Sequence, residues 1–318
     1  MKDQAFEDKI RGPYQPLCTP CHADGNIEEA IVGMLVRRQV DSGFHYGNGV
    51  VMVMGAAGEF ERFTTDKRKL VAERAIEAAN NDIGVVVGVQ AHNHDEMIDL
   101  AQHAARHGAV AIQVAPIAYF RPSADETYDI FKRVSENADI PIIAYTTYWK
   151  TRDDAFGWRN LERIVGLDNV KALKLCLPDF TGFQSAMADF ASEVSIFDNT
   201  IYEIESHVRG AVGVNWHMAV IKPDWAVKTW NHLENQEYEE AQKQIDTARV
   251  PYYRLAAEVG EVSESEAVLD KALLNMLGLQ VGNPRLPARP LPENLIRRAR
   301  EFLLNIGYEA GELCSSAT

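Results

Sequence analysis

The sequence predicts an α/β fold, a (β/α)8 TIM barrel with a C-terminal helical appendage. Short apolar runs alternate with helical patterns eight times in about 220 residues, a spacing that favours right-handed βαβ crossovers and a parallel sheet. No phosphate-binding GxGxxG lies in the first βα turn, as a dinucleotide-binding fold would require. After the eighth unit, the remaining helical patterns have no strands between them, which indicates an appendage made of helices.

The predicted strands are apolar runs of the kind that both faces of a parallel sheet cover. They span residues 15–20, 49–54, 83–89, 109–115, 140–145, 170–175, 194–197 and 211–214. The helical patterns that follow them span residues 27–40, 65–80, 95–107, 125–136, 158–165, 181–191 and 203–208. Further helices are expected at 238–259, 264–277 and 292–306. We therefore expect a catalytic barrel domain at 1–232 and a helical extension at 233–318 packed on it.

Composition and charge limit the class of protein. With 318 residues, of which 46% are hydrophobic and 25% charged, the chain is long enough to form a large globular core. A formal net charge of -14 argues against nucleic-acid or anionic membrane partners, which require basic surfaces. No apolar run approaches the roughly 18 residues of a membrane span, and the N-terminus has acids but no signal-peptide core. We expect a cytoplasmic protein.

Cysteines and histidines give no complete metal site. The four cysteines are too few for a disulfide framework in a chain of this length. Cys18 and Cys21 have the spacing of a redox or zinc motif, but no second pair completes a zinc site. His92 and His94 suggest a metal, yet the sequence identifies no third ligand. We therefore predict no metal.

Lys174 lies in the middle of the apolar run 169–177. An ammonium is costly to desolvate without a partner. The same desolvation lowers the pKa of a lysine and frees its amine to attack carbonyl groups. Because side chains alternate along a strand, Lys174 should point with Ala172 and Cys176. This strand alone leaves two interpretations open, namely a nucleophilic amine or a lysine paired with a carboxylate at a strand end.

Polar residues follow several predicted strands at their C-terminal ends, where (β/α)8 barrels place their chemistry. Tyr145 ends the fifth strand and Lys174 lies on the sixth, so both can point into one pocket. The glycines of the turn 55–58 let backbone N–H groups face a small anion such as a carboxylate. A lysine that condenses with a 2-oxo acid, a phenol that moves protons and amides that hold the carboxylate form one consistent mechanism.

The motifs together resemble those of the dihydrodipicolinate synthase and N-acetylneuraminate lyase superfamily of pyruvate-dependent class I aldolases. Residues 55–60, GAAGEF, resemble the family's G-[ST]-[ST]-G-E loop, and Tyr145 stands at the tyrosine of its Y-N-x-P motif. Further similarities are the Y-x-[RK]-P segment at Tyr119, Arg121 and Pro122, the Schiff-base strand at 170–174, the eighth strand at 210–213 and the C-terminal signature at 277–285. The resemblance identifies the chain as a divergent member.

The resemblance implies roles for individual residues. Lys174 would form the imine, Tyr145 would shuttle protons, and Tyr119 would complete a hydroxyl relay in a neighbouring subunit. The substrate-binding residues would be Gly55, Ala56, Ala57, Gly58, Lys150, Val214 and Asn215, with the amides of the two alanines holding the carboxylate. The resemblance also implies a homotetramer or homodimer, pyruvate as a 2-oxo acid partner, and no cofactor beyond the covalent lysine imine.

The chain departs from the family pattern at three places. Ala56 and Ala57 replace the two hydroxyl residues of the loop, so that a relay through a threonine hydroxyl cannot operate. Lys150 stands where the family has an arginine, and a lysine cannot make the planar two-point contact with a carboxylate. Residues 175–179, LCLPD, replace E-[AS]-[ST]-G-D and make that wall apolar. These changes argue against lysine biosynthesis and sialic-acid cleavage.

The predicted function is a Schiff-base-forming lyase that acts on a 2-oxo acid, with pyruvate as donor or product. The apolar wall, Tyr148 and Trp149 favour an acceptor aldehyde less polar than a sugar, as in a hydratase-aldolase. An alternative is a dehydratase of a 2-oxo-3-deoxy sugar acid that uses the same imine but releases no pyruvate. A third hypothesis, motivated by the alanines of the loop, is a non-catalytic barrel that binds a 2-oxo acid. The presence of both Lys174 and Tyr145 argues against it.

Overall fold

The fold is a (β/α)8 barrel, as predicted. The computed structural model describes residues 2–116 and 119–314, so the ends of the two predicted domains and residues 117–118 lie outside the description. Eight strands form one sheet in chain order, and the ladders from β3 to β8 are parallel. A parallel bridge between Tyr14 and Asn215 brings the first strand beside the end of the last. The sheet therefore closes on itself.

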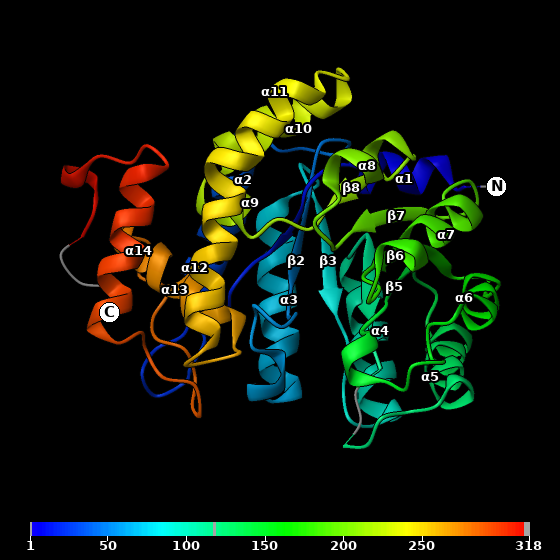
Figure 1. Cartoon of the computed structure of the whole chain (residues 1–318). Coiled ribbons are helices and arrows are strands. Elements are labelled where there is room, and N and C mark those ends of the chain that lie inside the picture. Colours follow the sequence, from blue (N-terminus) through cyan, green and yellow to red (C-terminus); the bar gives the residue numbers. More distant parts are fainter. Residues whose placement is uncertain (1, 117–118, 315–318) are drawn as a thin grey trace. The chain divides into compact units, whose positions relative to one another are not determined.

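Each predicted strand and helix of the eight units is present (Figure 1). The strands are β1 (Tyr14–Pro16), β2 (Val50–Val53), β3 (Gly84–Gly88), β4 (Ala111–Val114), β5 (Ile142–Tyr145), β6 (Val170–Leu175), β7 (Ser195–Asp198) and β8 (Gly213–Val214). The helices that follow them are α2 (Glu29–Asp41), α3 (Thr65–Ala79), α4 (His94–His107), α5 (Ala124–Asn137), α6 (Trp158–Val165), α7 (Phe180–Phe190) and α8 (Glu203–Val208). β1 is shorter than predicted, because Pro16 and Pro20 have no N–H group to extend the ladder.

The predicted C-terminal helices are also present, and two helices within 218–234 that were not predicted precede them. Together they are α9 (Met218–Ile221), α10 (Pro223–Glu234), α11 (Tyr238–Gln244), α12 (Val250–Gly260), α13 (Glu266–Met276) and α14 (Glu293–Asn305). The predicted helix at 238–259 is α11 and α12 joined by a π-helical turn, η3 (Ile245–Arg249). Pro251 explains this turn, because a proline within a helix cannot donate the usual backbone hydrogen bond. No described helix is long and apolar enough to cross a membrane.

The described residues group into two compact units. The first comprises the described parts of Met1–Tyr14, His45–Met52 and Asn80–Asn215. The second comprises those of Gln15–Phe44, Val53–Ala79 and Trp216–Thr318. This grouping does not test the domain boundary predicted at residue 232, which stays a prediction.

The core of the first unit fixes which strand residues face the barrel interior. Phe6 and Ile10 of a short helix, α1 (Gln4–Ile10), pack in one cluster with alternate residues of the strands. The strand residues of this cluster include Val50, Met52, Val86, Ala111, Ile143, Ala172 and Phe197. α1 was not predicted from the sequence, because it is short and mixes charged with apolar residues. The same parity that puts these residues inside puts Tyr145 and Lys174 on the interior face.

Candidate active site

Tyr145 and Lys174 are direct neighbours on β5 and β6, where they are partners in the parallel register. Lys174 Nζ lies 4.4 Å from the centroid of the Tyr145 ring and 5.0 Å from that of the Tyr14 ring. Only 6% of Lys174 is exposed. Two aromatic faces attract an ammonium through their quadrupoles and help to hold it in a buried place. The structure therefore brings together a lysine and a tyrosine that the sequence analysis predicted to be catalytic.

Asn199, the residue that follows β7, contacts Tyr145. Asn199, just beyond β7, donates a hydrogen bond from Nδ2 to the Tyr145 hydroxyl over 3.0 Å. Its backbone N–H donates to the Leu175 carbonyl over 3.0 Å, so that the β6 and β7 ladder continues past the strand end. Asn199 was not among the residues predicted from the sequence. Strand parity could have found it, because Asn199 follows the interior residue Phe197 by two positions.

Thr146 links the ends of β5 and β6. Its hydroxyl donates to the Cys176 carbonyl over 2.8 Å and accepts the Cys176 N–H over 2.7 Å. Burial raises the pKa of the Cys176 thiol to about 11, so that this side chain is a neutral thiol at physiological pH. The apolar wall predicted from 175–179 thus has a backbone that a threonine of the neighbouring strand holds in place.

Tyr14 is the second aromatic residue beside Lys174. Its hydroxyl donates to Gln113 Oε1 over 2.9 Å, and its ring meets Phe197 edge to face at 5.0 Å between centroids. Burial raises the pKa of Tyr14 well above its usual range, so the phenol stays protonated. Tyr14 therefore supplies an aromatic face to the ammonium and no titrating group.

The turn 55–58 is packed closely against its own backbone at Gly58. A Cβ on Gly58 would lie 2.9 Å from the Met54 nitrogen, so only glycine fits there. The Gly58 carbonyl accepts a hydrogen bond from the Thr19 hydroxyl over 2.8 Å. Within the described part of the chain, the N–H groups of Ala56 and Ala57 have no hydrogen-bond acceptor. Their role in holding a carboxylate stays a prediction.

The residue after this turn is the centre of a buried ion-pair network in the second unit. Glu59 and Lys271 are both fully buried, with 2.7 Å between carboxylate and ammonium. Arg62 approaches the same carboxylate to 2.9 Å, and the backbone N–H of Arg285 donates to it over 2.7 Å. The loop motif and the C-terminal signature are therefore parts of one network. This pairing was not predicted from the sequence.

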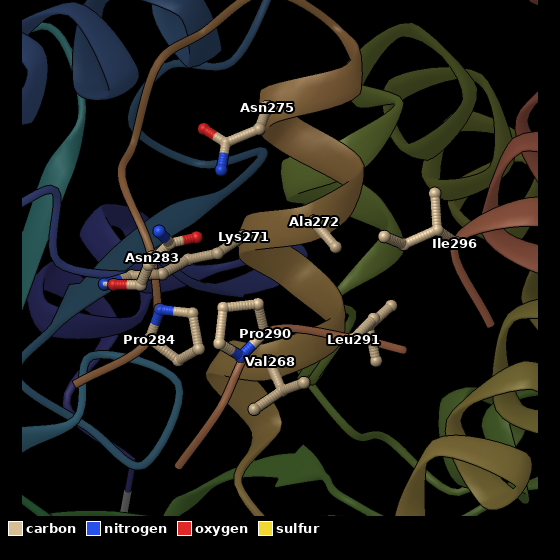
Figure 2. A pocket seen from close by; sticks show the side chains of 9 residues that line it. All are labelled: Val268, Lys271, Ala272, Asn275, Asn283, Pro284, Pro290, Leu291 and Ile296. Atoms are coloured by element: carbon tan, nitrogen blue, oxygen red, sulfur yellow. Dashed lines mark hydrogen bonds between the residues drawn. The ribbon is translucent and has the colours of Figure 1, made fainter. Parts of the chain in front are cut away.

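Lys271 also lines a small pocket in the second unit. Figure 2 shows its side chain extending from α13 toward Asn283, whose carbonyl accepts a hydrogen bond from Nζ over 3.1 Å. The other lining residues are Val268, Ala272, Asn275, Pro284, Pro290, Leu291 and Ile296. The Lys271 ammonium is engaged by the Glu59 carboxylate, the Asn283 carbonyl and the Cys21 sulfur, so its nitrogen is not available to a substrate. Of the two buried lysines among the described residues, Lys174 is therefore the better candidate for an imine.

The remaining predicted residues differ in exposure. Tyr119 and Lys150 are exposed, whereas Val214 and Asn215 are buried at the end of β8. Asn215 shares its register position with Tyr14, and paired positions of a parallel sheet face the same side. Asn215 thus faces the interior with Lys174. The roles predicted for these four residues, and for Gly55 and Gly58, stay predictions.

Cys18 and Cys21, which have metal or redox spacing, are free and buried. Burial raises the pKa of Cys18 to about 12, which disfavours the thiolate that metal binding and disulfide exchange require. Lys271 donates a hydrogen bond to the sulfur of Cys21 over 3.5 Å. Both cysteines thus belong to the packed interior around Lys271.

The parallel barrel thus has a buried lysine beside a tyrosine, both at the C-terminal ends of neighbouring strands, where barrels of this kind place reactive side chains. The sequence matches the model of the dihydrodipicolinate synthetase family over residues 9–304. The chain belongs to this family. It is an enzyme of the lyase class, with the class I aldolase type of mechanism, as the sequence analysis predicted.

Individual relatives agree with this assignment. The chain is 27% identical to a 4-hydroxy-tetrahydrodipicolinate synthase of Methanothrix thermoacetophila over 96% of its length and 99% of the relative. It is 28% identical to the corresponding synthase of Desulfotalea psychrophila, over 90% and 93% of the two chains. The fold is similar to the dihydrodipicolinate synthase of Agrobacterium tumefaciens, with a TM-score of 0.83, 21% identity, and 95% and 100% of the two chains covered.

A solved relative has pyruvate bound. The chloride-inhibited dihydrodipicolinate synthase of Acinetobacter baumannii, complexed with pyruvate, is similar in fold, with a TM-score of 0.82 and 22% identity. The similarity covers 94% of this chain and 99% of that one.

Proposed function

We propose that the protein is a Schiff-base-forming lyase that acts on a 2-oxo acid, with pyruvate as donor or product. The observation that carries this proposal is the pairing of Tyr145 with Lys174, whose Nζ lies 4.4 Å from the phenol ring. The pyruvate complex of the Acinetobacter baumannii synthase supports the choice of 2-oxo acid. No cofactor is needed, because the imine itself withdraws electrons.

The proposed steps follow from the chemistry of the two side chains. The Lys174 amine adds to the ketone of the substrate and loses water to give a protonated imine. The phenolate of Tyr145 then takes the proton of the 4-hydroxyl group as the bond between C3 and C4 breaks, which releases an aldehyde and leaves an enamine. Protonation of C3 and addition of water release pyruvate and restore the amine. Amides of Ala56 and Ala57 would hold the carboxylate.

The aromatic residues beside Tyr145 support an acceptor aldehyde less polar than a sugar. The Trp149 ring meets the Tyr145 ring edge to face at 5.9 Å, and it meets the Tyr148 ring at 5.1 Å. Trp149 is nevertheless exposed, so an apolar group could pack on it. We therefore favour a hydratase-aldolase. A dehydratase of a 2-oxo-3-deoxy sugar acid is the alternative, and its imine would form on the same lysine.

Assembly and location are further parts of the proposal. The fully exposed Tyr119 and the neighbouring Phe120 support a homotetramer or homodimer in which the tyrosine reaches another subunit. We propose the cytoplasm as the place of action, in keeping with the acidic composition.

An aldehyde panel tests the proposed reaction. Pyruvate consumption is measured with aromatic, aliphatic and hydroxylated aldehydes, with the Lys174→Arg variant as control. We expect consumption with at least one aldehyde and a loss of about 1,000-fold or more in the variant, because arginine keeps the charge but forms no imine. Turnover that survives in Lys174→Arg would contradict the proposal. Dehydration of a sugar acid without pyruvate release would favour the alternative.

A further inference from the structure

The alanines at 56 and 57 raise a question about Tyr145. Without a hydroxyl in the loop, another group must orient the phenol for proton transfer. We propose that Asn199 is the positioning residue for Tyr145 and takes the place of the missing hydroxyl. This inference rests on the proposed function, because it assumes that Tyr145 moves the proton.

The contact between the two side chains has the geometry of a directed hydrogen bond. Asn199 Nδ2 lies 3.0 Å from the Tyr145 hydroxyl oxygen, within the usual range for an N–H donor. A hydrogen bond donated to a phenol oxygen stabilises the phenolate more than the phenol. It also fixes the position of the Asn199 amide relative to the phenol oxygen. Asn199 therefore favours the basic form of Tyr145 that the proposed step needs.

Asn199 is itself held by the unusual segment beside Lys174. Its backbone N–H donates to the Leu175 carbonyl, and its side chain lies close enough to the Cys176 thiol to influence the pKa of that thiol. Thr146 fixes the backbone of Cys176 through two hydrogen bonds. The ends of three strands thus determine where the amide of Asn199 lies. Leu175 and Cys176 of the sequence LCLPD, which departs from the family pattern, would thus help to position Asn199.

The proposed role of Asn199 restricts the path of the proton. A threonine hydroxyl can accept one proton while it gives up another, but a carboxamide donates a hydrogen bond and keeps its proton. Asn199 therefore cannot pass a proton from Tyr145 to solvent. In the proposed cleavage, the proton taken from the 4-hydroxyl group stays on the phenol and is then delivered to C3 of the enamine. This proton therefore need not exchange with solvent during cleavage.

The titratable neighbours of the phenol come from β1 and from β6 with the residue that follows it. The ammonium of Lys174 on β6 lies 4.4 Å from the centroid of the Tyr145 ring and 5.0 Å from that of the Tyr14 ring on β1. The Cys176 thiol lies near Asn199, which in turn contacts the phenol. Since these groups also influence the ionisation of Tyr145, the test must isolate the amide by changing Asn199 alone.

The experiment measures ionisation of Tyr145 by the absorbance of tyrosinate. Subtracting the Tyr145→Phe titration isolates the single phenol, and the same subtraction is made in the Asn199→Leu and Asn199→Asp backgrounds. We expect a higher midpoint in Asn199→Leu, where the donor is lost, and a still higher one in Asn199→Asp, where a carboxylate faces the phenol. Turnover should fall about 10- to 100-fold with little change in KM. Asn199→Asp is nearly isosteric and serves if Asn199→Leu fails to fold.

Two outcomes separate this inference from the proposed function. A midpoint unchanged in both variants would overturn the role of Asn199, whatever the protein catalyses. Borohydride trapping with pyruvate is measured in parallel, and we expect adduct formation in wild type and both variants. A shifted midpoint without any adduct in wild type would support the positioning role and overturn the lyase.

Discussion

Replacing Tyr145 by phenylalanine is expected to lower turnover by about 100- to 10,000-fold, the range that general acid–base groups contribute. The ring remains in the variant, so the face that Lys174 Nζ approaches at 4.4 Å is kept. Imine formation with pyruvate should therefore decrease much less than turnover. The measurement is kcat for aldol cleavage beside the rate of adduct trapping by borohydride.

Tyr148→Phe is the matched control for this prediction. Tyr148 is on the same loop, and its ring contacts Trp149, but the proposed chemistry does not use its hydroxyl. We expect kcat of this variant to remain within a few-fold of wild type. Equal losses of turnover and imine formation in Tyr145→Phe would show that the phenol serves imine formation and that its role as proton shuttle is wrong.

Replacing Lys271 by methionine is expected to destabilise the protein by about 3–5 kcal/mol, because it leaves a buried carboxylate without its partner ammonium. Lys271 and Glu59 are fully buried, with 2.7 Å between ammonium and carboxylate. The variant keeps the contacts of the Glu59 carboxylate with Arg62 and with the backbone N–H of Arg285. These two remaining contacts place the expected loss at the lower end of the range. Urea unfolding of the two proteins measures the difference.

Lys243→Met provides the control for the loss of an ordinary lysine. Lys243 contacts Glu240 at 2.6 Å, but both side chains are exposed to solvent. Exposed ion pairs contribute little, so we expect the urea midpoint to stay at the wild-type value. A wild-type midpoint for Lys271→Met would contradict the assignment of Lys271 as a structural residue and would return it to the candidates for imine formation.

Local pattern was enough to predict the barrel and the pair at its centre. Strands and helices follow from apolar periodicity, and parity along β5 and β6 placed Tyr145 and Lys174 on one face. The N-terminal helix α1 was missed because its short segment has little periodicity. The turn at 245–249 was missed because a proline within a helical pattern does not reveal whether the helix ends or adapts.

The rest of the site depends on contacts between distant parts of the chain. Nothing near Glu59 in the sequence indicates that Lys271 neutralises it, and a buried lysine on a helix gives no strand-like signal. Asn199 looks like an ordinary polar residue after a strand until the Tyr145 hydroxyl is found 3.0 Å away. These residues could not be predicted because their contacts join distant parts of the chain, and such contacts leave no local pattern in the sequence.

The central claim is that Lys174 is the imine-forming residue. Incubation with pyruvate and borohydride, followed by peptide mass analysis, tests it most directly. Lys171, on the outward face of the same strand, and Lys271, held by Glu59, are internal controls. The account predicts a carboxyethyl group on Lys174 and none on the two controls. An adduct on Lys271, or an unmodified Lys174 after exhaustive reduction, would contradict it.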